Sequence, residues 1–84
     1  ARIQPLAQLD GAELGLWEMT AGRVTDVEAD EVFVVIAGRG TLTLGDGTSV
    51  ALRPGVVVRL DEGERTTWTV TETLRKVYLT AADG

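Results

Sequence analysis

One stretch of the sequence, residues 31–40 (EVFVVIAGRG), limits the possible folds more than any other. Six of the seven residues from Glu31 to Ala37 are apolar, four of these are β-branched, and Gly38-Arg39-Gly40 follows directly. Such a short apolar run predicts a strand that is buried on both faces and then enters a tight hairpin. The carboxylate of Glu31 at its start needs a partner, because a buried charge must be paired, protonated or bound to a metal.

Turn residues separate further short strands along the rest of the chain, and no segment has the apolar period of a long helix. We expect eight strands, at residues 14–20, 23–27, 31–37, 41–44, 48–52, 56–60, 66–71 and 75–80. This pattern predicts an all-β sandwich or barrel formed by one domain. Within residues 1–84 we expect an N-terminal arm over 1–11, the barrel over 12–80 and a loose tail over 81–84.

Composition excludes several classes of function. The 84 residues include no cysteine and no histidine, which removes disulfides, thiolate chemistry and the commonest metal ligand and general base. The net charge is −5 and no basic cluster exceeds Arg75-Lys76, so we expect no nucleic acid partner. No apolar run is long enough to span a membrane and no signal peptide is recognisable, so we expect a cytoplasmic protein without a membrane partner.

Two of the expected strands are apolar on both faces, Val32 to Ile36 and Val56 to Val58. One face fills the interior, and the other would form a sizeable exposed apolar patch unless the arm or a second subunit covers it. We therefore expect a homodimer.

Two motifs in this chain resemble those of the cupin superfamily. Glu31 and Gly38 match the second half of the first cupin motif, and Gly55 and Gly63 frame the second. Residues 63–78 are similar to the C-terminal signature of the small (S)-ureidoglycine aminohydrolase-like cupins, at Trp68, Glu72, Arg75, Lys76 and Tyr78. The resemblance implies an antiparallel eight-stranded jelly-roll β-barrel.

Metal-binding cupins supply three histidines and the glutamate, and here only Glu31 keeps its ligand position. The aligned histidine positions hold Thr25 and Val27, or Val24 and Asp26 one residue earlier, and Thr66. A carboxylate with neutral oxygens is a poor set of ligands for metals that favour imidazole. We expect no tightly held metal or other cofactor, and leave open a weakly bound divalent manganese, iron or zinc ion.

Six residues are candidates for contact with a small polar metabolite in the barrel: Arg23, Thr25, Glu31, Thr66, Trp68 and Tyr78. Glu31 is either a ligand anchor or base, or the structural ion-pair partner of Arg23, and the missing metal ligands favour the pair. Trp68 shares strand parity with Thr66, so it faces inward as a pocket wall or simply fills the barrel.

Three function classes remain open. The first is a binding module for a small polar metabolite without a tightly held metal. The second is a dimeric scaffold with a closed barrel. The third is a metal-dependent enzyme of the aminohydrolase, isomerase or decarboxylase type. Whether the chain is an enzyme at all stays undecided at this level.

Overall fold

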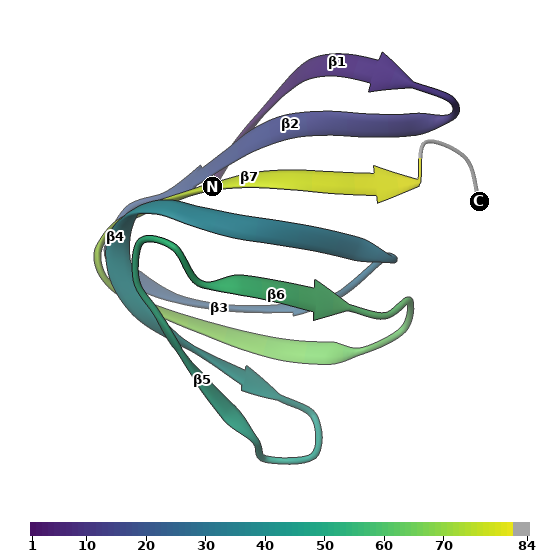
Figure 1. Cartoon of the computed structure of the whole chain (residues 1–84). Helices are drawn as coiled ribbons and strands as arrows, with labels where there is room; N and C mark the ends of the chain where they lie inside the picture. The colour runs from purple at the N-terminus through teal and green to yellow at the C-terminus, as the bar shows by residue number, and fades with distance from the viewer. Residues whose placement is uncertain (82–84) are drawn as a thin grey trace.

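The computed structural model describes residues 1–81 and shows one antiparallel sheet of seven strands (Figure 1). The strands are β1 (Arg2–Leu9), β2 (Ala12–Met19), β3 (Gly22–Val27), β4 (Glu31–Leu44), β5 (Ser49–Leu52), β6 (Val57–Leu60) and β7 (Arg65–Ala81). None of the described residues forms a helix that is long and apolar enough to cross a membrane.

Two long strands, β4 and β7, form the centre of the sheet and pair with each other over most of their length. The first half of β7 also pairs with β3 and its second half with β2, which in turn pairs with β1. The first half of β4 pairs with β6 and its second half with β5. Figure 1 shows both long strands bending so that their two halves run in two facing layers.

The predicted count of eight strands is wrong, because two predicted turns lie inside long strands and the predicted N-terminal arm forms a strand of its own. The Gly38-Arg39-Gly40 segment is not a hairpin turn but a region of register shifts in β4, between Val35 and Gly40. A Cβ on Gly38 would overlap the backbone oxygen of Thr73, so glycine lets β4 approach β7 closely at this bend. The two strands predicted at residues 66–71 and 75–80 join in the same way to form β7.

Both ends of the chain also differ from the expected arm and loose tail. Residues 2–9 form β1, an edge strand whose residues are all exposed, rather than an arm lying over the body. Ala81 ends β7, and the rest of the expected tail, residues 82–84, lies outside the described residues.

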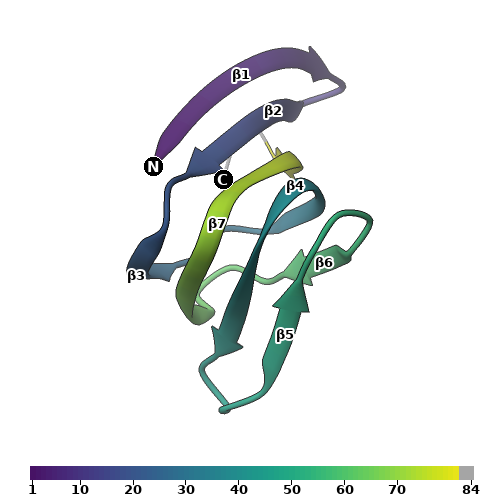
Figure 2. The same cartoon turned by 90° about the vertical axis from the view of Figure 1, so that its left-hand side faces the viewer.

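The predicted closed barrel is wrong as well, since four strands, β1, β3, β5 and β6, each pair on one side only among the described residues. β1 lies at one end of the path and β5 at the other, and Figure 2 shows these two strands at opposite ends of the molecule. The all-β antiparallel architecture is confirmed, as an open, jelly-roll-like sheet.

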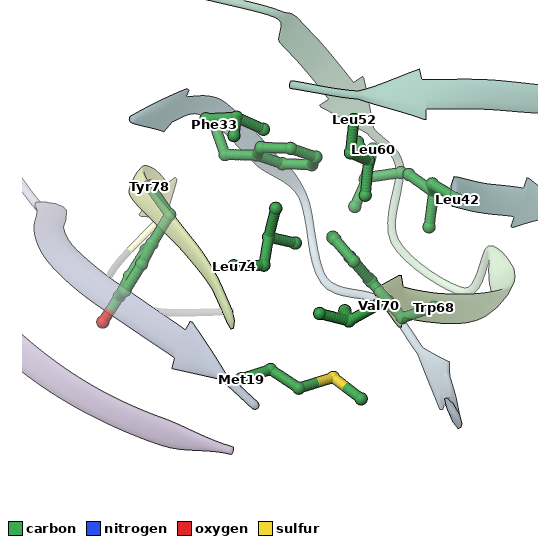
Figure 3. Close-up of a cluster of buried hydrophobic side chains, with 10 residues drawn as sticks. Met19, Phe33, Leu42, Leu52, Leu60, Trp68, Val70, Leu74 and Tyr78 are labelled. Atoms are coloured by element: carbon green, nitrogen blue, oxygen red, sulfur yellow. The ribbon is translucent and has the colours of Figure 1, made fainter. Parts of the chain in front are cut away.

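The core fills the space between the two layers (Figure 3). Its largest fully buried side chains are Phe33, Leu42, Leu52, Leu60, Leu74 and Val35. In β7 the buried positions are all even-numbered from Thr66 to Tyr78, apart from the exposed Glu72 at the bend. This alternation is the period of two that a half-buried strand requires, and it decides which polar side chains of β7 face inward.

Candidate functional site

A buried lysine ammonium lies at the centre of the polar residues in the interior. Lys76 is 3% exposed, and its Nζ donates a 2.6 Å hydrogen bond to Oε2 of Glu31. The ammonium also lies over three aromatic rings, with Nζ-to-centroid distances of 4.2 Å to Phe33, 4.4 Å to Trp68 and 4.8 Å to Trp17. A carboxylate and aromatic faces are the groups that stabilise a desolvated ammonium.

Strand register explains how these groups meet. Trp17 is the direct cross-strand partner of Lys76 between β2 and β7, so the two side chains share one face of the sheet. Glu31 begins β4 next to β7, and the long lysine side chain reaches it along the strand direction. Burial lowers the pKa of Lys76, whereas the charge of Glu31 and its hydrogen bond oppose that shift.

A second buried carboxylate, Glu28, lies between β3 and β4. Its Oε2 accepts hydrogen bonds from the Thr66 hydroxyl at 2.6 Å and from the Trp68 indole at 3.2 Å. The backbone N–H of Glu28 donates to the carbonyl of Glu64, which ties the segment before β4 to the start of β7. Glu28 is 9% exposed, so these two donors replace most of its hydration.

Tyr78 forms the third polar contact of this region. Its hydroxyl donates a 2.9 Å hydrogen bond to Oε2 of Glu13. Removal from water, the hydrogen bond to Glu13 and nearby negative charge raise the pKa of Tyr78 to about 12. The phenol fits because its direct cross-strand partner is Gly15, where any Cβ would overlap the ring. Gly15 therefore makes room for the tyrosine.

These groups surround a cavity of about 310 Å³. Its charged side chains are the four carboxylates Glu13, Asp26, Glu28 and Glu31, together with Lys76, and Tyr78 and the N-terminal residue Ala1 line it as well. Its apolar wall includes Ile3, Trp17, Val24 and Trp68. The volume lies at the small end of the range of about 300–1,000 Å³ for ligand pockets, and mixed apolar and polar walls are typical of such sites.

A wider surface hollow of about 730 Å³ lies nearby. Thr25, Thr43, Arg65 and Thr67 contribute to its wall, and Asp26 and Thr66 border it as well. It contains none of the aromatic side chains and lacks Lys76. We therefore take the smaller cavity as the candidate site.

The six residues predicted from the sequence are divided by the structure. Glu31, Trp68 and Tyr78 line the smaller cavity together, and Thr66 supports it through Glu28. Thr25 is exposed and belongs to the wider hollow.

Arg23 is exposed too, and the predicted ion pair between Arg23 and Glu31 is wrong. The cation that pairs with Glu31 is Lys76. On β3 the residues that face the cavity are Val24 and Asp26, so Arg23 and Thr25 lie on the opposite face of that strand.

The donor set does not fit a divalent metal at the position that the cupin motif implies. Within residues 1–81, no three Asp, Glu, His or Cys side chains are close enough together to hold a metal ion. The one retained ligand, Glu31, already holds the Lys76 ammonium, whose positive charge would repel a second cation. The aligned histidine positions carry Thr25 and Val27, or Val24 and Asp26, and Thr66, none of which supplies an imidazole.

Five charged or aromatic residues of the cavity were not among the predicted site residues: Glu13, Trp17, Asp26, Glu28 and Lys76. A signal for Lys76 was present, because it shares even parity on β7 with Trp68 and Tyr78, which were assigned to the interior. Glu28 carried no such signal, since it lies in the irregular segment between β3 and β4.

Comparison with known proteins identifies the same architecture. A family model described as the EutQ-like cupin domain matches residues 6–78. None of the curated proteins compared with the chain matches it.

Solved structures show where this fold occurs. The EutQ protein of Clostridium difficile is 24% identical, with a TM-score of 0.84, and the match covers 98% of this chain and 68% of that one. A cupin superfamily protein of Desulfitobacterium hafniense DCB-2 is 18% identical, with a TM-score of 0.78, covering 98% and 77%. Ectoine synthase of P. lautus is 22% identical, with a TM-score of 0.78, covering 87% and 55%. At these identities the likeness establishes the fold alone.

Proposed function

Because the chain belongs to the EutQ-like cupin domain family, we propose that it binds a small polar molecule in the cavity beside Glu31 and Trp68. The cavity itself carries the proposal. A scaffold protein needs no interior space, whereas this fold leaves about 310 Å³ beside charged and aromatic side chains. The molecule would contact Trp68 and Tyr78 on β7 and the carboxylates opposite them.

Binding in this cavity needs no metal. Lys76 supplies the positive charge that Glu31 requires, so the carboxylate is neutralised within the chain. The enzyme alternative, including the aminohydrolase activity suggested by the C-terminal signature, would need a metal at a position whose donors do not fit one. One structural neighbour, ectoine synthase of P. lautus, has the name of an enzyme, but the likeness to it concerns the fold alone.

Thermal denaturation with a panel of small metabolites of different charge tests the binding proposal. Ligands that occupy the cavity raise the melting temperature and change the tryptophan emission, since Trp17 and Trp68 both line the wall. Ala29→Phe should fill the cavity and abolish the response, while Ala51→Phe, at an exposed alanine on β5, should not. A response that Ala29→Phe leaves intact, or no response to any ligand, would refute binding at this site.

We also propose that a second copy of the chain is the protein partner. The supporting feature is β1, an edge strand that exposes Ile3, Leu6 and Leu9 by 61%, 55% and 76%. A free strand edge with apolar side chains is a surface that natural proteins usually cover.

A further inference from the structure

We propose that the ligand of this cavity is a small organic ammonium ion, a proposal that rests on the binding function above. The first support is the charge balance of the wall. Among the side chains of the wall, four carboxylates face the cavity against one ammonium, and Lys76 is already paired with Glu31. Three carboxylates remain, those of Glu13, Asp26 and Glu28, and none has a cation within salt-bridge distance among residues 1–81.

The burial of Glu28 makes this deficit more specific. Its side chain lines the cavity in a residue that is more than nine-tenths buried, yet its two partners, Thr66 and Trp68, are neutral donors that share Oε2. Within the described part of the chain, Oε1 has no donor. Oε1 is not among the fully buried polar atoms without a partner, so it stays accessible, and a cationic ligand in the cavity would donate to it.

The hydrogen-bonding groups of the wall point the same way. The indole of Trp68, the phenol of Tyr78 and the ammonium of Lys76 all donate to carboxylates of the cavity itself. The wall therefore offers mainly acceptors to a ligand. A carboxylate or phosphate would meet repulsion, whereas an ammonium group brings both a positive charge and up to three donors.

The cavity wall already binds one alkylammonium, which belongs to its own chain. The Lys76 head group lies against Glu31 and over the rings of Phe33, Trp68 and Trp17. Trp17 and Trp68 both reach the cavity surface, so a ligand would meet the same combination of indole and carboxylate. This combination recognises ammonium groups in proteins generally.

A charge series of similar size tests the proposal: n-butylammonium, n-butanol and butyrate, each titrated against the protein by calorimetry and tryptophan fluorescence. We expect n-butylammonium to bind most tightly, n-butanol weakly and butyrate not at all. Added salt should weaken the binding of n-butylammonium, although less than for an exposed charge pair.

Two neutral variants locate the binding. Glu13→Gln and Asp26→Asn should each weaken n-butylammonium binding about tenfold, as a charge-assisted hydrogen bond becomes a neutral one. Both keep the shape of the side chain. Glu72→Gln removes the same charge from an exposed position on β7 outside the cavity and should leave the affinity unchanged.

The possible failures are distinguishable. Tighter binding of n-butanol or butyrate in the cavity would overturn the ammonium proposal and leave the binding function standing. Equal weakening by Glu72→Gln would also overturn it, because the effect would then be one of overall charge. If no compound of any charge binds, the binding function fails together with the ammonium proposal.

Discussion

Replacing Glu31 by glutamine tests whether the pair with Lys76 holds the interior together. The change keeps the size of the side chain and one oxygen acceptor but removes the charge that faces the ammonium. Removing one partner of a buried ion pair destabilises by about 3–5 kcal/mol. Lys76 keeps its contacts with three aromatic rings, each stabilising by roughly 0.5–2 kcal/mol, so we expect about 3 kcal/mol.

This loss is large for a domain of 84 residues. One kcal/mol corresponds to about 4–8 °C at this size, so the melting temperature should fall by about 12–24 °C. Urea denaturation followed by circular dichroism measures the same change as a free energy of unfolding. Glu72→Gln, at an exposed position, is the matched control and should change stability by less than about 0.5 kcal/mol.

The reciprocal change completes the cycle. Lys76→Met leaves the Glu31 carboxylate without its cation and should also destabilise by about 3 kcal/mol. The double variant removes both charges and should lie within about 1 kcal/mol of the original protein, because a well-packed neutral pair is often as stable. Additive effects, or a Glu31→Gln variant with an unchanged melting temperature, would refute the structural role of the pair.

The destabilisation by Glu31→Gln should shrink as the pH rises. Burial lowers the pKa of Lys76 from its ordinary value of 10.5, and losing the Glu31 charge removes the main opposing effect. Between the folded pKa and 10.5 the unfolded chain binds more protons, so folding stability increases with pH in that window. Stability measured from neutral pH up to pH 10 should show this trend more strongly in the variant.

Four further outcomes are expected. Tyr78, the one tyrosine of the chain, should ionise with a midpoint at about pH 12 when followed by absorbance, and Glu13→Gln should move that midpoint toward 10. Because the phenol loses its proton at lower pH in the unfolded chain, the free energy of unfolding should fall as the pH rises from 10 to 12. A midpoint near 10 in the folded protein would contradict the contact with Glu13. Gly15→Ala should destabilise the protein by about 1–3 kcal/mol, because the new Cβ would overlap the ring of Tyr78. Gly45→Ala should not, since the nearest atom to its new Cβ is 3.4 Å away. Equal effects of the two variants would contradict the close packing of Tyr78 against Gly15. Elemental analysis after incubation with excess Mn²⁺ should find no stoichiometric metal, and one ion per chain would show that the side chains around Glu31 do hold a metal. Light scattering should give the mass of two chains, and of one chain for Leu6→Arg on β1; a single-chain mass for the original protein would refute the dimer.

Most of what could be predicted about the site came from the alternation of side chains between the two faces of a strand. Alternation along β7 placed Trp68 in the interior, and the structure buries it at 2% exposure. The same argument applied to Lys76, which shares parity with Tyr78, would have placed its side chain in the interior. On β3 the sequence alternates too weakly to choose a face. The alignment left Thr25 and Val27 or Val24 and Asp26 open, and the candidate Thr25 does not line the cavity, whereas Val24 and Asp26 do.

The bends of the long strands were harder to foresee. Glycines such as Gly38 and Gly40 are compatible with a hairpin turn or with a bulge in a continuing strand, and only tertiary pairing distinguishes the two. In the structure β4 continues because β7 pairs with it on both sides of the bend. The count of strands and the closure of the barrel depended on that distinction, whereas the all-β class did not.

The pairing of β4 with β7 also has a consequence for how this chain reaches its native state. Residues far apart in sequence, such as Glu31 and Thr80, are direct neighbours in the sheet. Closing such long loops costs conformational entropy before the strands gain their stabilising contacts. Domains dominated by pairings between distant residues therefore fold in milliseconds to seconds rather than microseconds. Since both layers contain a half of each long strand, neither layer is complete without the other. Stopped-flow refolding should therefore show slow formation of the whole sheet in one concerted step.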